Sequence, residues 1–118
     1  MDIEKFRGYC LSKKGATEDF PFDDTTLVMK VLDKMFALVN LDGDLSINLK
    51  CDPEKAIDLR EQYPAVKPGY HMSKKHWNTI IVDGSIATVL IEQWIDESYN
   101  LVISKMTKKQ REVLNLYP

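Results

Sequence analysis

The sequence predicts an α+β fold in which helices pack on one face of an antiparallel sheet. Three apolar or alternating segments follow one another between residues 25 and 49 with short polar breaks, which is typical of strands joined by hairpins. Segments whose apolar residues recur at helical spacing precede these strands, interrupt them and follow them. The resulting order, α-β-β-β-α-β-α, favours one sheet with its helices on a single face.

The N-terminal segment is expected to form a helix followed by an edge strand. The helix is predicted at residues 2–13, with Asp2 as its N-cap and Gly15 as the stop that follows it. Its apolar residues recur at helical spacing: Ile3, Phe6, Cys10 and Leu11. The segment 16–22 is expected to add a strand at the sheet edge, because Pro21 lacks the N–H that a central strand needs.

A three-stranded meander is predicted next, at residues 25–32, 35–41 and 45–49. The first two segments are rich in β-branched and apolar residues, and the third alternates apolar with polar side chains. A turn is expected at Asp33-Lys34. Asp42-Gly43 is expected to form a type I′ turn, which needs positive φ at both central positions and favours the Asp-Gly pair.

The second helix and a further strand follow the meander. Asp52 is the expected N-cap of this helix, because Pro53 suits the first helical position, and the helix is expected to extend to about Tyr63. Its expected apolar stripe is Ala56, Ile57 and Leu59. Residues 77–82 are apolar and β-branched and therefore predict one more strand.

A long helix and a short one are expected to complete the chain. Ser85 is predicted to cap the long helix. The residues expected on its core face are Leu90, Trp94, Ile95, Leu101 and Val102. Thr107 and Gln110 have the spacing of a capping box, which predicts a last short helix with Val113 and Leu114 facing inward.

The composition is typical of one globular domain spanning residues 1–118. Hydrophobic residues make up 44% of the chain and charged residues 29%, enough to bury a core and solvate a surface. No run is apolar enough to span a membrane, and no signal peptide is recognisable, so a cytoplasmic protein is expected, with a monomer favoured. Cys10 and Cys51 are accordingly expected to be reduced thiols.

Motifs of the common enzyme and metal-binding classes are absent. The chain has no Gly-rich nucleotide loop, no nucleophile elbow and no cysteine pair at zinc spacing. His71 and His76 are its only histidines, and no further metal ligands stand at suitable spacing beside them. The sequence therefore predicts a protein that is not an enzyme and that has neither a cofactor nor a metal site.

Acidic and basic residues are unevenly distributed along the chain. The net charge is −2, yet no acidic residue lies between Gln62 and Val82, where three lysines and both histidines fall. A second acid-free stretch covers residues 98–111. This asymmetry indicates an anionic partner, and a solvated surface of mixed charge explains it equally well.

The first acid-free stretch supplies the candidate DNA-binding residues. They are Lys67, Tyr70, His71, Lys74, Lys75, His76, Trp77 and Asn78. The lysines would neutralise phosphates of double-stranded DNA, the expected partner. Asn78 or His71 would read a base edge or orient a phosphate. Tyr70 or Trp77 would stack on an exposed base, although Trp77 is better explained as a core residue.

Several short segments, in order along nearly the whole chain, resemble the MmcQ/YjbR family of small bacterial proteins. They are Phe20-Pro21-Phe22, Lys34-Met35-Phe36-Ala37, Leu49-Lys50-Cys51-Asp52-Pro53, Gly69-Tyr70-His71-Met72, Lys75-His76-Trp77-Asn78-Thr79 and Ser98-Tyr99-Leu101-Val102. The resemblance implies a compact fold like that of the bacterial frataxin homologue CyaY. It also implies a DNA-binding protein in which loops and strands flank a helix.

Two other functions are compatible with the same residues. In a protein-interaction or small-ligand module, Trp77 would be core, Tyr70 and His71 would line a groove, and Asn78 would hydrogen-bond the backbone. Frataxin-like iron handling would need a ridge of carboxylates, and the first helix offers only Asp2 and Glu4. Iron handling is therefore the less favoured of the two.

Overall fold

The computed structural model describes all 118 residues. It contains six strands and four helices, joined by loops. In chain order they are α1 (Ile3–Leu11), β1 (Ala16–Asp19), β2 (Thr26–Val31), β3 (Lys34–Asn40), β4 (Ser46–Lys50), α2 (Pro53–Gln62), β5 (Val66–Pro68), β6 (Trp77–Ile81), α3 (Thr88–Ser104) and α4 (Lys108–Asn115). The α+β class and the extra strand β1 are confirmed. β5 was not predicted, because three residues are too few to show a strand pattern. The CyaY-like arrangement stays a prediction.

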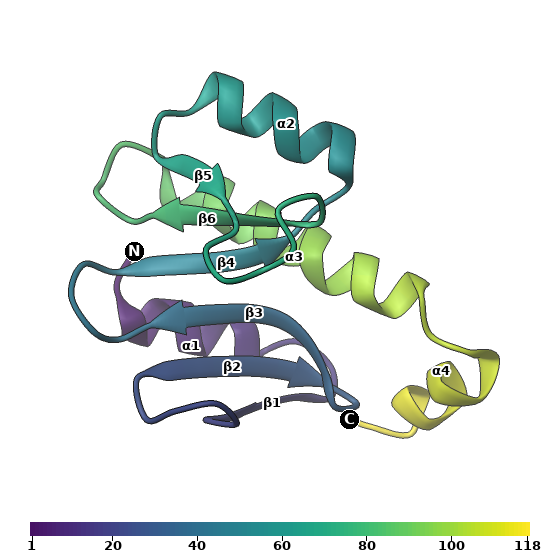
Figure 1. Cartoon of the computed structure of the whole chain (residues 1–118). Coiled ribbons are helices and arrows are strands. Elements are labelled where there is room, and N and C mark those ends of the chain that lie inside the picture. The colour runs from purple at the N-terminus through teal and green to yellow at the C-terminus, as the bar shows by residue number, and fades with distance from the viewer.

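All six strands form one antiparallel sheet in the order β1-β2-β3-β4-β6-β5, so β1 and β5 are its edges. In Figure 1, α1 and α3 lie behind the sheet, and α2 lies beside β5 and β6. The core fills the space between these helices and the sheet. Its fully buried large side chains include Phe6, Phe36, Met29, Ile47 and Ile95. The opposite side of the sheet carries no helix, and we call it the open face.

The tight hairpin turn between β2 and β3 lies at Leu32–Asp33, one residue earlier than the predicted Asp33-Lys34, because Lys34 already pairs with Val31. Both residues have positive φ, 47° and 64°, and the flanking strand residues pair directly, as in a type I′ turn. At the position predicted for such a turn, only Gly43 has positive φ, and Asp42 does not. Residues 41–45 form a longer loop there instead. The type I′ prediction at Asp42-Gly43 was wrong because pairing register, not the dipeptide, sets the turn.

Replacing Asp33 with glycine is expected to raise the free energy of unfolding by roughly 0.5 kcal/mol. A left-handed conformation strains an L-residue but not glycine, and the greater entropy of glycine in the unfolded chain offsets part of the gain. Urea unfolding of the variant measures the change. Asp44→Gly is the matched control, because Asp44 is also exposed but lacks positive φ, so its stability should fall slightly. Equal effects of the two substitutions would contradict the argument.

The predicted N-caps are confirmed at three of the four helices. Asp2 accepts the Lys5 N–H at 2.8 Å, Asp52 accepts two N–H groups of the first turn of α2, and Thr107 forms the full capping box of α4. The prediction for α3 was wrong. The Ser85 N–H and hydroxyl both donate to Asp83 instead, and α3 begins at Thr88 without a side-chain cap.

The core faces of the helices agree with the prediction in part. Buried as predicted are Trp94, Ile95, Val102, Ala56 and Leu114. Leu90 and Leu101 are only half-buried, whereas Ile91, Ser98 and Tyr99 are buried without having been predicted. Ile57 is 52% exposed and Val113 is 41% exposed, so both point away from the core. α2 and α4 are short and show too few apolar positions to fix the buried face to within one residue, whereas α3 has runs of three apolar residues at 89–91 and 101–103, which leave the face ambiguous.

Ser98 links α3 to the sheet from inside the core. Its hydroxyl donates to the Phe36 carbonyl at 2.6 Å and accepts the Lys50 N–H at 2.9 Å. These two backbone groups belong to β3 and β4 and lie just beyond Ala37 and Leu49, the last residues that pair between the strands. The serine therefore satisfies backbone groups that the ladder leaves free.

The two cysteines are unbridged, as expected. Cys10 lies in the core, and burial raises the pKa of its thiol to about 12. Because the thiolate is the reactive form, Cys10 is expected to be inert at neutral pH.

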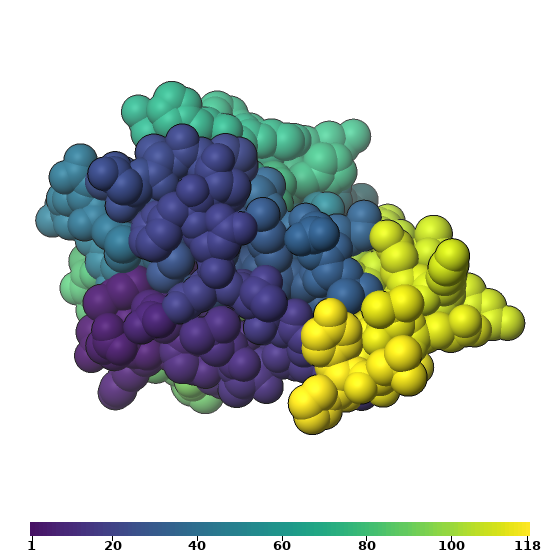
Figure 2. Space-filling model, turned by 90° about the horizontal axis from the view of Figure 1, so that it is seen from below, coloured from purple at the N-terminus to yellow at the C-terminus, as the bar shows by residue number.

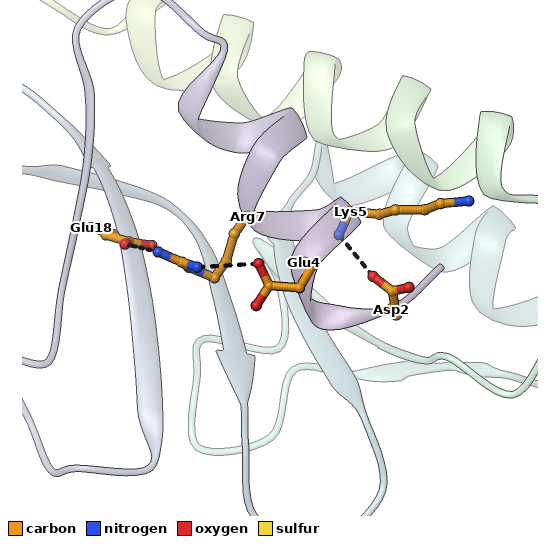
Figure 3. A network of polar contacts seen from close by, with 5 residues as sticks. All are labelled: Asp2, Glu4, Lys5, Arg7 and Glu18. Carbon is orange, nitrogen blue, oxygen red and sulfur yellow. Dashed lines mark hydrogen bonds and ion pairs between the residues drawn. The ribbon is translucent and has the colours of Figure 1, made fainter.

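Arg7 joins α1 to the edge strand β1. Its guanidinium donates to both carboxylate oxygens of Glu18 and reaches Glu4 at 3.5 Å (Figure 3). The hydrogen bond from Arg7 is the main reason that the pKa of Glu18 lies below its usual value, since it favours the charged carboxylate. The pair therefore favours the folded state when Glu18 is ionised.

Replacing Glu18 with glutamine is expected to make stability less sensitive to acid. A lowered folded-state pKa contributes stability above the unfolded pKa, and this contribution is lost as the pH falls through the folded pKa. The parent should therefore be more stable than the variant at pH 7, and the gap should close below about pH 4. Thermal unfolding from pH 7 to pH 3 measures it. Glu4→Gln is the control, because the Glu4 side chain is 79% exposed. A constant gap would contradict the argument.

α4 stands at one end of the molecule, as Figure 2 shows in yellow. Leu114 anchors it to the rest of the chain, because this side chain is buried close to Gly15 and packs with the core. No helix combines the length and apolar character that a membrane span requires.

Candidate ligand groove on the open face of the sheet

Strand register places two rows of side chains across the open face. Side chains of directly paired residues point to the same face of a sheet. The first row is Lys67, Thr79, Asn48, Leu38 and Val28. The second row is Ile81, Ser46, Asn40 and Thr26. Most of these side chains are polar, and those on β4 and β5 are all polar. This face therefore has a hydrogen-bonding surface at its centre.

Residues 69–76, which we call loop 69–76, fold back over one end of this face. The Gly69 N–H donates to the Trp77 carbonyl at 2.9 Å, and the Tyr70 N–H donates to the Thr79 hydroxyl at 2.9 Å. Met72 packs on a small apolar cluster of Val28, Leu38 and Trp77. The loop is therefore fixed to the sheet by its backbone and by one apolar side chain.

A groove of about 730 Å³ runs between loop 69–76 and the loop that joins β1 to β2. The two rows form its floor, apart from Val28. Tyr70 and His71 stand on one side, with their ring centroids 4.0 Å apart, and Phe22 stands on the other. Phe22 is 64% exposed and Tyr70 is 69% exposed. Aromatic rings thus face solvent on both walls of a polar-floored groove.

The floor has hydrogen-bond donors that the chain itself does not use. The Thr79 hydroxyl accepts from Tyr70 and donates to the Asn48 side-chain oxygen, which leaves the Asn48 amide nitrogen free. The Asn40 side-chain oxygen accepts the Asp42 N–H at 3.0 Å, which likewise leaves its amide nitrogen free. The Ser46 hydroxyl also makes no hydrogen bond within the chain. The floor therefore offers donors to a ligand that is rich in acceptors.

The two ends of the groove carry opposite charge. Lys67 lies at the β5 end and forms no ion pair. Asp23 and Asp42 line the groove from the loops beyond the other strands. The N–H groups of Thr25 and Thr26 donate to Asp23 and lower its pKa, so this carboxylate stays charged. A ligand that spans the groove meets a cation at one end and carboxylates at the other.

The structure divides the residues that the sequence proposed for DNA binding. Lys67, Tyr70 and His71 line the groove. Lys74, Lys75 and His76 are exposed on loop 69–76 outside it, and Lys74 donates to the Gly69 carbonyl at 3.1 Å. Trp77 and Asn78 are buried, and the Asn78 amide donates to the Ala56 carbonyl at 3.2 Å. These two side chains are therefore unavailable to a partner.

The basic residues do not form one face. Lys67 is on the edge strand β5, whereas Lys109 on α4 lies beside Thr17 of the other edge strand, β1. Lys105, just after α3, lines a smaller hollow with Ser73 and His76. No group of three or more His, Cys, Asp or Glu side chains is arranged to hold a metal ion.

The floor residues were missed as site residues. The alternation in the sequence places Ser46 and Asn48 on the solvent-exposed side of a strand. No local sequence pattern, however, distinguishes a groove floor from an ordinary solvent-exposed face. Phe22 has a usable signal, because an aromatic residue beside a proline in an acidic loop has no place in a core. Pairing of β4 with β6 places Ser46 and Asn48 in the groove floor, and that pairing is set by the whole fold.

The chain is similar to several bacterial proteins over most of its length. It is 33% identical to the uncharacterised Escherichia coli K12 protein YjbR over 115 residues, which cover 97% of this chain and 98% of that protein. It is 38% identical to the uncharacterised protein YbdF of Escherichia coli O157:H7 over 94 residues, or 79% of this chain and 77% of YbdF.

Solved structures and a family model agree with these relatives. A crystal structure of a Deinococcus radiodurans protein matches with a TM-score of 0.90 and 41% identity, covering 97% of this chain and 88% of the other. A Pseudomonas syringae crystal structure matches with a TM-score of 0.75 and 28% identity, covering 86% and 98%. The YjbR family model matches residues 11–101, from the end of α1 through most of α3. The chain therefore belongs to the YjbR family.

Proposed function

We propose that the protein is a binding module that holds a small ligand in the groove on the open face. The observation that best supports this proposal is the size of the groove. Its volume of about 730 Å³ lies within the range of about 300–1,000 Å³ that is usual for small-molecule sites. Its exposed aromatic rings offer apolar contact to a ligand, and its unused hydrogen-bond donors would fix the orientation of that ligand.

A ligand screen followed by backbone amide chemical shifts tests this function. Ligands should shift the amides of residues 22–26, 46–48 and 70–72 and leave those of α4 unchanged. Phe22→Ala should weaken binding at least tenfold, because this ring lies in the groove. Phe20→Ala is the matched control, since Phe20 is exposed in the same loop but does not line the groove. Shifts confined to other surfaces, or no ligand at all, would refute the proposal.

Double-stranded DNA is the second candidate partner, and loop 69–76 favours it. Lys75 is exposed, and Lys67, Lys74 and Lys75 form no ion pair, so no carboxylate of the chain competes with a phosphate for them, although Lys74 also donates to the Gly69 carbonyl. Support for this candidate is weaker, since Asp23 and Asp42 border the same face and would repel a long polyanion.

Titration of a labelled duplex at several salt concentrations distinguishes this candidate. The double variant Lys74→Glu with Lys75→Glu should lower the affinity and reduce the salt slope by about 1.8, since each lost phosphate contact removes about 0.9. Lys108→Glu with Lys109→Glu makes the same change of charge on α4 and should have a smaller effect. No binding at low salt, or equal effects of the two variants, would exclude DNA held by this loop.

A further inference from the structure

We infer that the ligand of the groove is a mononucleotide that carries an amino group on its base. This inference rests on the proposed function and names the ligand class. It combines three properties of the groove: aromatic rings on both walls, a cationic end with free donors, and an acidic end. Each property selects one part of the ligand.

The walls select a planar ring. Phe22 and Tyr70 come from different loops, are mostly exposed, and stand on opposite sides of the groove. The Tyr70 ring also contacts the His71 ring, which lines the same wall. Stacking on aromatic side chains is the usual way in which proteins hold unpaired bases, because every base has a π-face. In a duplex these faces are covered by neighbouring bases, so the walls favour an unpaired base.

The β5 end selects an anionic group. Lys67 is exposed and pairs across the strands with Thr79, which itself pairs with Asn48. The lysine ammonium and the free amide of Asn48 therefore lie on the same row of the same face. A phosphate, with several acceptor oxygens and at least one negative charge, fits this set of donors.

The far end selects a hydrogen-bond donor. Asp23 lies beyond the start of β2, so the four strand spacings between β5 and β2 separate it from Lys67 by at least about 19 Å. Asp42 borders the groove between these two positions. A phosphate on the extended Lys67 side chain would leave the base over the middle of the floor, where an exocyclic amino group can reach a carboxylate. Cytosine, adenine and guanine have such a group, whereas uracil has only the single donor of its ring N3–H.

Calorimetric titration with CMP, AMP, cytidine, UMP and inorganic phosphate tests the inference. CMP should bind most tightly, and cytidine and UMP should each bind at least tenfold more weakly, because one lacks the phosphate and the other the amino group. Phosphate alone should not bind measurably. Lys67→Gln should weaken CMP at least fivefold and leave cytidine unchanged. Lys34→Gln is the control, since Lys34 is exposed at the far end of β3.

The outcomes separate this inference from the function on which it rests. If other small molecules bind in the groove but CMP and AMP do not, the nucleotide is wrong and the small-ligand function stands. If single-stranded oligonucleotides bind and mononucleotides do not, the inference is also overturned, because the occupant is then a strand. If nothing binds in the groove, both fail. Equal binding of CMP and UMP would remove the role of the carboxylates and refute the ligand as stated.

Discussion

Replacing Ser98 with alanine is expected to lower the free energy of unfolding by about 3 kcal/mol. The Ser98 hydroxyl is completely buried and bonds both the Phe36 carbonyl and the Lys50 N–H. Alanine would leave both backbone groups without a partner in a place where water cannot replace the hydroxyl. Each unsatisfied buried group costs about 1–3 kcal/mol. Urea unfolding at pH 7, followed by circular dichroism, measures the loss.

Ser104→Ala in the same helix is the matched control. Ser104 is exposed, and its hydroxyl donates only to the Leu101 carbonyl within the helix. Alanine is the better helix former, so this variant should be unchanged or slightly more stable. If Ser98→Ala were also within about 0.5 kcal/mol of the parent, the two hydrogen bonds would not be responsible for holding α3 against β3 and β4.

Replacing Gly69 with alanine is expected to destabilise the fold by about 2 kcal/mol and to open the groove. A β-carbon at this position would lie 2.8 Å from the Trp77 β-carbon, 2.9 Å from the Trp77 carbonyl oxygen and 3.1 Å from the Met72 β-carbon. Two of these atoms belong to the sheet, so loop 69–76 must move. Forcing an extra methyl group into a packed site costs about 1–3 kcal/mol.

Gly8→Ala provides the comparison for the second prediction. Gly8 is exposed in α1, and a β-carbon there meets nothing within 4 Å. That variant should gain about 1 kcal/mol from helix propensity. Thermal unfolding gives both stabilities, and the amide shifts of residues 70–72 report the position of the loop. Parental stability for Gly69→Ala would show that the loop gives way without cost.

Features that depend on a few neighbouring residues were predictable. Asp52 and Thr107 cap their helices because the N–H groups that they accept lie within three residues along the chain. Ser85 failed as a cap because α3 begins only at Thr88, three residues later, and Ser85 instead donates to Asp83 in the preceding turn. The prediction of a type I′ turn at Asp42-Gly43 failed for a less local reason, since the turn with positive φ at both central positions formed at Leu32-Asp33 instead. Leu32 and Asp33 take up positive φ because β2 and β3 pair in a register that leaves two residues between them.

Only the site residues that lie close together in the sequence were predictable. Lys67, Tyr70 and His71 lie in one segment, so their charge and aromatic character were visible together. Trp77 and Asn78 belong to the same segment but are buried. Neighbours in a strand point to opposite faces, and here loop 69–76 covers one face while α2 covers the other. The groove floor depends on the order of strands, which no local pattern specifies.

The two edges of the sheet have a consequence for self-association. An exposed strand edge can pair with the edge of another molecule and so begin aggregation. Here one edge strand has four residues and carries Glu18 and Asp19, and the other has three residues and ends in Pro68, which has no N–H to offer. Neither edge gives a second molecule a long template. The short, charged or proline-ended edges therefore disfavour edge-to-edge pairing of this six-stranded sheet with a second molecule.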